Sequence, residues 1–378
     1  MHRRPLSARP DADHGLVHVI TRGAVSACAP GRVELLGNHT DYNEGVVLGA
    51  AINRFVCVSG AKHGRSIPIT SGAFGRVEIA AEELRPIQES RWANYILGVA
   101  DELRKLDVPV GGFSIDVRGD LAISARLSSS AALELATALF LLKVFPADLP
   151  RLEIAKACQR AEHRYVGVQS GLLDQVISLL GPAQHAVFFD CRTEEIRTIA
   201  FPSSLALIIA DSGKTRSLAS GEYNLRRMET QTAARAFGVR ALRDVKSVDI
   251  NRRTDIPQLL RRRALHIAQE NERVWRAVKL LDAGEGPAFG KLMNASHESS
   301  RANFGNSTPE LDLLVSVAQR MDGVFGARLT GAGFGGATVT LCERKAANAV
   351  AQELSSEYAT RTGTEPQVFV CETADGAR

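Results

Sequence analysis

The sequence predicts an α+β protein of two domains, and three observations support this prediction. The chain has 378 residues, which is enough for two domains with sizeable cores. Its content of 45% hydrophobic and 23% charged residues is typical of a globular protein. Short apolar runs with strand character alternate with segments of helical periodicity, most clearly in the C-terminal part of the chain.

The domain organisation follows from composition and from the order of these segments. Residues 1–15 are polar and contain proline, so we expect a flexible N-terminal tail. We assign residues 16–200 to an N-terminal domain and residues 201–378 to a C-terminal domain. The boundary falls near residues 195–205, between two apolar runs that each resemble a strand.

In the N-terminal domain, alternating or short apolar runs predict strands, and apolar residues at helical spacing predict helices. The expected strands cover residues 32–37, 46–52, 55–60, 77–80, 113–117 and 186–190, with a polar loop over 38–45 between the first two. The expected helices cover residues 91–105, 128–142, 152–166 and 171–180. Gly167 is a plausible C-cap for the third helix.

In the C-terminal domain, the same criteria predict strands over residues 205–210, 326–330, 337–341 and 367–370. They predict helices over residues 220–237, 258–281, 288–300, 309–321 and 346–357. Residues 240–256 carry Asp and Pro punctuation, and we expect them to be irregular.

Composition also excludes several classes of function. The net charge of +4 is too small to indicate nucleic-acid binding, and no apolar run approaches the roughly 20 residues that a membrane span needs. The N-terminus lacks the apolar segment of a signal peptide. The six cysteines are scattered, without a C-x-x-C pair, so we expect reduced and mostly buried thiols. We therefore expect a cytoplasmic protein that acts on small molecules. We also expect a monomer, although the composition does not bear on the oligomeric state.

One stretch, A-I-S-A-R-L-S-S-S-A-A-L-E-L-A at residues 122–136, combines small polar residues with the start of an apolar helix. The first backbone N–H groups of a helix have no partner inside it, and the positive end of the helix dipole attracts anions such as phosphate. The serine hydroxyls could also serve only to cap the helix. On its own this stretch does not decide between a phosphate site and an ordinary N-cap.

Three blocks together resemble the GHMP small-molecule kinases, and specifically the galactokinase family. They are G-R-V-E-L-L-G-N-H-T-D-Y-N-E-G-V-V-L at residues 31–48, L-S-S-S-A-A-L at 127–133 and L-T-G-A-G-F-G-G-A-T-V at 329–339. They resemble, in order, the sugar-binding signature, the phosphate-binding motif and the C-terminal glycine motif. The resemblance implies the GHMP kinase fold, with an N-terminal α/β domain of ribosomal-S5-like type, a ferredoxin-like α+β C-terminal domain and an active site between them.

The same resemblance implies an ATP-dependent kinase that phosphorylates a sugar at the anomeric hydroxyl, with D-galactose as the first candidate and Mg²⁺ as the metal. It assigns catalysis to Asp174 and Arg32. A carboxylate beside the hydroxyl can orient it or accept its proton, and a guanidinium keeps that carboxylate ionised and can face the phosphoryl group. It assigns Mg²⁺ to Ser130 and Glu162, which offer the oxygen ligands that this cation prefers.

The remaining roles that the resemblance implies are binding roles. Short polar side chains on a loop can recognise sugar hydroxyls through paired donors and acceptors. The predicted sugar-binding residues are Asn38, His39, Asp41, Gly171 and Tyr223. The predicted ATP-binding residues are Trp92, Arg126, Ser128, Ser129, Ser130 and Gly333.

The chain departs from the family pattern at two places. Asn38 stands where the sugar signature usually has a Glu that accepts from a hydroxyl at the C6 end of the sugar, so a uronic acid, a deoxy sugar or a modified hexose is an alternative substrate. The phosphate loop lacks both of its usual glycines, and Arg126 occupies one of those positions. A side chain there can strain the backbone, whereas a guanidinium can bind phosphate. A non-catalytic sugar sensor on the same fold is therefore the alternative to a kinase.

Overall fold

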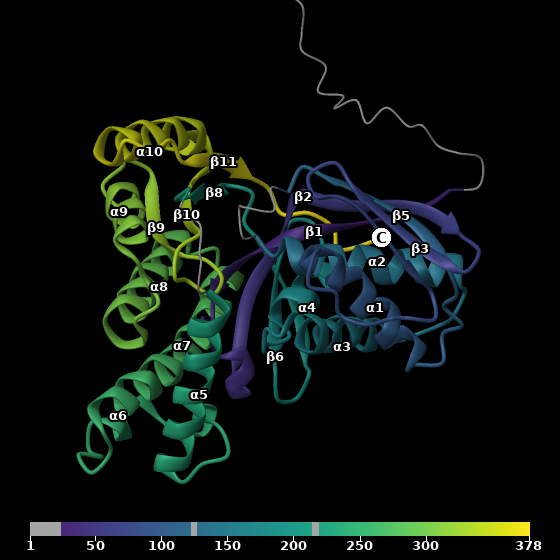
Figure 1. The fold of residues 1–378 in the computed structure, drawn as a ribbon. Helices are drawn as coiled ribbons and strands as arrows, with labels where there is room; N and C mark the ends of the chain where they lie inside the picture. The colour runs from purple at the N-terminus through teal and green to yellow at the C-terminus, as the bar shows by residue number, and fades with distance from the viewer. Residues whose placement is uncertain (1–23, 122–126, 214–218) are drawn as a thin grey trace, which may run out of the picture.

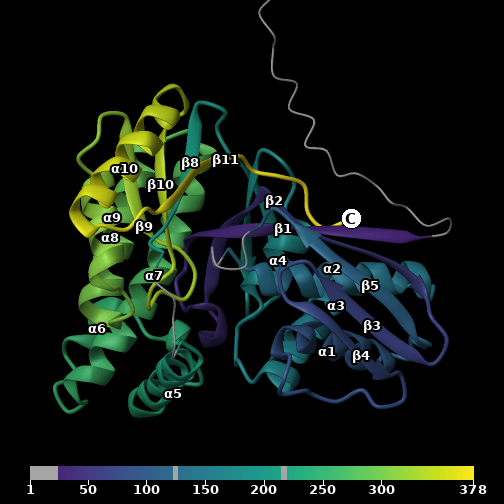
Figure 2. The ribbon, with the colours of Figure 1, turned by 45° about the horizontal axis from the view of Figure 1, so that its top comes forward.

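The computed structural model describes residues 24–121, 127–213 and 219–378. The described chain forms two domains side by side, each built on its own β-sheet (Figures 1 and 2). The predicted N-terminal tail and Arg126 lie outside the described residues.

The first domain contains a mixed, seven-stranded sheet. Six strands follow the order β4-β3-β5-β2-β6-β7, and the seventh strand, β1, pairs with β2 outside this order. Neighbouring strands are antiparallel except β3 and β5, which are parallel. The strands are β1 (Val25–Leu36), β2 (Val46–Lys62), β3 (Ser66–Ser71), β4 (Gly75–Ala80), β5 (Phe113–Gly119), β6 (His185–Asp190) and β7 (Ile196–Ala200). The helices α1 (Asn94–Arg104), α2 (Ser129–Val144), α3 (Arg151–Ala161) and α4 (Leu173–Leu180) lie together against the sheet (Figure 1).

Helix α2 is the centre of this domain. It is apolar on nearly every side and packs against β1, β2 and the helices around it, as expected for a helix with no polar face. The body of this helix is enclosed in the core. Among the described helices, none combines the length and apolarity needed to cross a bilayer.

The second domain contains an antiparallel sheet of order β11-β8-β10-β9, formed by β8 (Leu205–Asp211), β9 (Val324–Leu329), β10 (Ala337–Glu343) and β11 (Gln367–Cys371). The helices α5 (Ala219–Phe237), α6 (Ser247–Ile250), α7 (Gln258–Asp282), α8 (Gly286–Ser299) and α9 (Pro309–Ala318) come between β8 and β9, and α10 (Ala347–Thr362) comes between β10 and β11. A βαββαβ order with the first strand beside the fourth is ferredoxin-like, which confirms the predicted fold class.

Several element boundaries differ from the prediction. β2 is one long strand where two were predicted, and β3 and β7 were not predicted. The helix predicted over 152–166 ends as a π-helical turn, Glu162–Val166, and Gly167 closes it with a φ of 83° as predicted. The segment predicted to be irregular contains α6 and a short 3₁₀ turn, Leu242–Asp244.

The chain passes between the domains twice. The first crossing lies between β7 and β8. After β11 the chain returns to the first domain, where Thr373 forms a bridge with Ile52 and the backbones of Cys28 and Arg378 exchange two hydrogen bonds of 2.9 Å. Residues 372–378, assigned from sequence to the C-terminal domain, thus pack on the N-terminal one.

The expectation that all cysteines are reduced is wrong for one pair. Cys28 on β1 and Cys57 on β2 are direct partners in the antiparallel register and form a disulfide. They are 29 residues apart in sequence, so only the strand pairing brings them together. Cys158, Cys342 and Cys371 are buried free thiols.

Candidate active site

A cavity of about 480 Å³ lies between the two domains and is lined by both. Its walls come from β1, the loop that follows β1, the start of α2, the start of α4 and the loop after β9. The predicted site residues that line it are Arg32, Asn38, His39, Asp41, Trp92, Ser128, Ser129, Ser130, Glu162, Gly171, Asp174 and Tyr223. The fold thus brings together residues that are up to 191 positions apart (223 minus 32).

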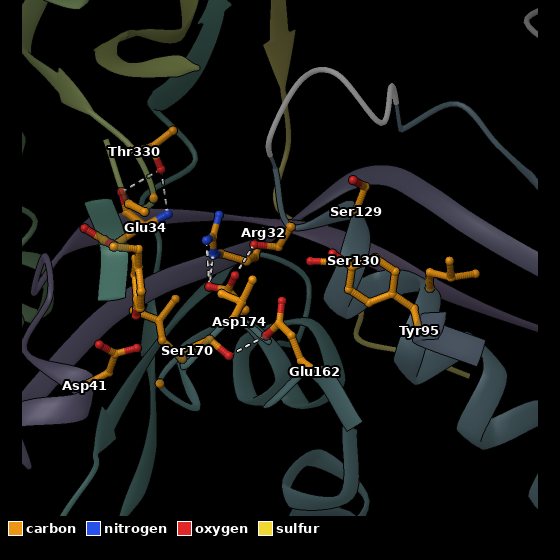
Figure 3. Close-up of a pocket in the computed structure, with 18 of the residues that line it drawn as sticks. Arg32, Glu34, Asp41, Tyr95, Ser129, Ser130, Glu162, Ser170, Asp174 and Thr330 are labelled. Carbon is orange, nitrogen blue, oxygen red and sulfur yellow. Dashed lines mark hydrogen bonds and ion pairs between the residues drawn. The ribbon is translucent and has the colours of Figure 1, made fainter. Parts of the chain in front are cut away.

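Asp174, in the first turn of α4, is held by two side chains (Figure 3). Its Oδ1 accepts a hydrogen bond from Arg32 Nε at 2.7 Å and lies 2.6 Å from Arg32 Nη2. Its Oδ2 accepts from Ser128 Oγ at 2.5 Å. Arg32 is 4% exposed, and its Nη1 has no partner among the described residues. The cavity therefore holds an oriented carboxylate beside a guanidinium whose Nη1 can still donate hydrogen bonds to a ligand.

The N-terminus of α2 opens into the same cavity. Ser128 precedes the helix in the left-handed conformation, with a φ of 59°. Its hydroxyl donates to Asp174 and does not cap the helix, which was one of the two alternatives that the sequence left open. The preceding backbone is pinned to β1, because Arg32 N donates to Leu127 O at 3.1 Å. A Cβ at Gly31 would lie 2.8 Å from that same oxygen, so glycine permits the close approach. The first N–H groups of α2 are thus left available to an anion.

Glu162 provides a second carboxylate, in the π-helical turn after α3. Ser170 Oγ donates to its Oε2 (Figure 3). The pKa of Glu162 is raised to about 7, mainly by burial; the negative charge of Asp174 contributes to this rise and the hydrogen bond from Ser170 opposes it. Burial also raises the pKa of nearby Glu134, where the charge of Glu162 adds to the effect. The charge of Arg32 lowers the pKa of Glu162, but burial outweighs it. Glu162 and Ser130 both line the cavity and offer oxygen ligands of the kind that Mg²⁺ prefers.

The loop after β1 supplies a third carboxylate, that of Asp41. The pKa of Asp41 is raised to about 7, mainly by burial, and the charges of Asp174 and Glu34 contribute to this rise. An added Cβ at Gly171 would lie only 1.8 Å from Asp41 Oδ2, so only glycine leaves room for this carboxylate. The ring of Tyr223 on α5 lies 5.3 Å from the ring of His39, which completes this wall.

His39 and Asn38 are held by the second domain. His39 has a φ of 61°, and its Nε2 donates to Ala332 O at 2.9 Å while its Nδ1 accepts from Tyr42 OH at 2.7 Å. Asn38 is fully buried, and its side-chain amide bonds to Gly331 O at 2.8 Å. The loop after β1 (residues 37–45, the sugar loop of the sequence prediction) and the loop after β9 (residues 330–336, the glycine loop) are therefore joined by direct hydrogen bonds.

A buried network on α7, which the sequence analysis did not identify, holds the backbone of this loop. Glu270 Oε2 accepts from Gly37 N at 3.0 Å and from Asn38 N at 3.1 Å, and Oε1 pairs with Arg273 at 2.5 Å. His266 Nε2 donates to Asn38 O at 3.1 Å. The charged spacing on α7 resembles that of an ordinary surface helix, so only the fold reveals this role.

The opposite end of the cavity is aromatic. Trp92 and Phe74 stack with ring centroids 5.6 Å apart, and both line the cavity together with Tyr95. The indole Nε1 of Trp92 is buried and has no partner among the described residues. A planar heterocycle with an acceptor atom would fit such a surface. Phe74 and Tyr95 were not predicted, although Tyr95 lies one helical turn after Trp92.

In the glycine loop, the predicted contact residue is not the one at the cavity. Gly331 and Gly335 line the cavity, whereas Gly333, with a φ of 74°, packs against Asn306. A Cβ at Gly333 would lie 2.2 Å from Asn306 O. Gly333 therefore permits close backbone packing behind the cavity wall.

The chain is similar in sequence to known galactokinases over almost its whole length. The chain is 38% identical over 95% of its length to a galactokinase of Roseiflexus sp. (strain RS-1), covering 92% of that protein. The chain belongs to the galactokinase family. A galactokinase of Pasteurella multocida (strain Pm70) is also 38% identical, over 92% of this chain and 93% of that protein.

Family models and solved structures agree with this membership. Residues 20–62 match the galactokinase galactose-binding signature, residues 94–182 the N-terminal domain of GHMP kinases and residues 277–360 their C-terminal domain. The structure of Lactococcus lactis galactokinase complexed with galactose superposes with a TM-score of 0.91 at 30% identity, over 95% of each chain. Methanococcus jannaschii mevalonate kinase has the same fold, with a TM-score of 0.68 at 21% identity over 94% of this chain and 100% of that one. This galactokinase family member thus has the two-domain GHMP kinase fold.

Proposed function

We propose that the protein transfers the γ-phosphoryl group of ATP to the anomeric hydroxyl of D-galactose, forming galactose 1-phosphate and ADP. The observation that carries this proposal is the position of Asp174, bonded to Arg32 and Ser128 at the start of α2 in the cavity between the domains. Two relatives that are 38% identical to this chain are galactokinases, and the structure of Lactococcus lactis galactokinase is a complex with galactose.

In the proposed reaction, Asp174 orients the anomeric hydroxyl and takes its proton as the oxygen attacks the phosphorus atom. The ion pair with Arg32 fixes the orientation of this carboxylate. Arg32 Nη1, which has no partner among the described residues, can then donate to the phosphoryl oxygens as negative charge spreads over them. The backbone hydrogen bond from Arg32 N to Leu127 O holds Arg32 in a fixed position relative to the start of α2.

We propose that the phosphates lie at the N-terminus of α2, where the free N–H groups and the hydroxyls of Ser129 and Ser130 face the cavity. Ser130 and Glu162 would hold Mg²⁺, which supplies positive charge against the phosphate oxygens. The adenine ring would lie against Trp92 and Tyr95. All of these groups come from one chain, so we propose that a monomer is active. We also propose that it acts in the cytoplasm, where ATP is available.

The test is ADP release with Mg-ATP and D-galactose. We expect turnover that requires galactose and that falls about 10²–10⁴-fold in Asp174→Asn. Asp148→Asn, which changes an exposed carboxylate before α3, serves as the matched control and should retain the wild-type rate. Equal rates in both variants would exclude the role of Asp174. Galactose binding by calorimetry without any turnover would instead indicate a sugar sensor.

A further inference from the structure

A second side chain on β1 faces the cavity beside Arg32. Residues two apart in a strand point to the same face and lie about 7 Å apart, so Arg32 and Glu34 share one wall. Both line the cavity. The backbone of Glu34 is fixed from across the cleft, because Glu34 N donates to Thr330 Oγ1 at 2.9 Å and this hydroxyl donates to Glu34 O at 3.1 Å (Figure 3). The carboxylate therefore projects from an anchored position.

The two oxygens of this carboxylate differ in their surroundings. Oε1 accepts from Asn38 Nδ2 at 3.0 Å and lies 2.9 Å from Nη2 of Arg328, which is fully buried. Oε2 has no hydrogen-bond partner among the described residues. Burial raises the pKa of Glu34, whereas the charges of Arg328 and Arg32 lower it. Oε1 thus holds the side chain in place, and Oε2 is left to accept a hydrogen bond from a ligand.

Asn38 has no such free atom. Its Nδ2 donates to Glu34 Oε1 and to Gly331 O, and its Oδ1 accepts from Asn306 Nδ2 at 2.8 Å and from Ser300 Oγ at 3.4 Å. A side-chain amide has two donor hydrogens and two acceptor positions, and all four are taken by protein groups. The direct sugar contact predicted for Asn38 would require one of these buried bonds to break.

We propose that Glu34, supported by Asn38, selects the sugar by accepting a hydrogen bond from a hydroxyl at the end of the substrate farthest from the reacting one. This inference rests on the proposed kinase function, which places the reacting hydroxyl at Asp174 and Arg32. A hexose bound there extends along β1 toward Glu34, two residues away on the same strand face. Asn38, which replaces the usual Glu of the family signature, therefore does not imply a changed substrate. The carboxylate of Glu34 on β1 would contact the same end of the sugar.

The proposal also excludes one of the alternative substrates. A uronic acid would bring a second carboxylate to Glu34, and Asp41 lies close enough to interact with the charge of Glu34. Like charges in a partly buried site repel, so a substrate with an acidic group at this end binds poorly. The substrate class is thus a neutral sugar with a hydroxyl donor at the remote end.

The wild-type protein tests this directly with three sugars. We expect 6-deoxy-D-galactose, which lacks the C6 hydroxyl, to have a kcat/KM about 10–100-fold below that of D-galactose. We expect no measurable binding of D-galacturonic acid at concentrations that saturate with galactose. Calorimetric binding of the same sugars without nucleotide provides a readout that does not depend on turnover. Absence of turnover with all sugars would refute the kinase, whereas galacturonic acid binding as well as galactose would refute the role of Glu34.

Variants locate the effect at one residue. Glu34→Gln should reduce the preference for galactose over the 6-deoxy sugar to below about 5-fold and should allow galacturonic acid to bind. The double exchange Glu34→Asn with Asn38→Glu keeps one carboxylate and one amide in the pair, so it should fold and restore the preference. Glu44→Gln, a carboxylate at the far end of the same loop, is the matched control and should resemble wild type. An unchanged sugar preference in Glu34→Gln would overturn the proposal.

Discussion

The buried carboxylate of Glu270 allows a prediction whose size follows from the structure. Glu270→Gln keeps the shape of the side chain but removes the charge that Arg273 needs, and it turns amide hydrogens toward a guanidinium or toward the backbone N–H groups of the sugar loop. Breaking a buried ion pair by neutralising one partner typically costs about 3–5 kcal/mol.

The pKa of Glu270 gives a second, independent value for this loss of folding stability. Burial would raise this pKa, but neighbouring positive charge, led by Arg273, lowers it from its ordinary 4.5 to about 2. A shift of this size corresponds to about 3 kcal/mol of folding stability. Because the folded-state pKa is depressed, this stability is fully present above pH 4.5 and is lost as the pH falls toward 2. We therefore expect the same loss in the variant at pH 6 and at pH 8.

Thermal unfolding provides the assay. A loss of about 3 kcal/mol should lower the melting temperature by roughly 6–12 °C for a domain of this size. Glu272→Gln on the same helix is the matched control, because Glu272 is exposed and makes one contact of 3.4 Å to Ser247 N. We expect the control to change the stability by less than about 0.5 kcal/mol. Equal melting temperatures for the two variants would refute the reasoning.

Four further outcomes follow from the site and the sheet. Asp41→Asn should raise the melting temperature at pH 8 but not at pH 4. The folded-state pKa of Asp41 is about 7, so ionisation of this buried carboxyl lowers the stability of the wild-type protein as the pH rises from about 4 to 7. An effect that does not depend on pH would contradict this. Gly171→Ala should push the Asp41 carboxylate aside and raise KM for galactose about 100-fold, whereas Gly221→Ala, with open space around it, should not. Glu162→Gln should raise the Mg²⁺ concentration for half-maximal rate at least about 10-fold, and chelation should abolish turnover; an unchanged Mg²⁺ titration would remove Glu162 from the metal site. Thiol titration of the unfolded, unreduced protein should count four free thiols; six would show that the bridge between β1 and β2 is absent.

The sequence predicted the fold class because its strongest patterns are local. The apolar stretch after Ser130 indicates a buried helix, and α2 is one. The alternation of strands and helices after residue 300 indicates an α+β domain, whereas only the family resemblance implied its ferredoxin-like order. The serine run and the two other motifs lie far apart in sequence but meet at one cavity, which the family resemblance implied and spacing alone could not show.

The strand β2 shows why local patterns fail at boundaries. Polar residues Asn53 and Arg54 interrupt its apolar pattern and suggested two strands. In the structure, Asn53 exchanges hydrogen bonds of 3.0 Å with Glu372, and the Arg54 guanidinium lies 5.0 Å from the ring centroid of Phe369. The interruption marks a contact with the C-terminal part of the chain, more than 300 residues away.

The pair Glu34 and Asn38 shows the same limit inside the site. Asn38 was the visible departure from the family signature, but its four partners include residues more than 260 positions away. Nothing near Asn38 in the sequence indicates that its amide is saturated. Glu34 had one usable signal, its spacing of two residues from Arg32 within a strand.

The two chain crossings between the domains have a mechanical consequence. Two domains joined by a single linker can both swing and twist relative to each other. Here the segment before β8 and the segment after β11 connect the domains at separate places, and the second is anchored by hydrogen bonds to β1 and β2. A rigid body attached at two points can only rotate about the axis through them. The two connections therefore restrict the relative motion of the two domains more than a single linker would.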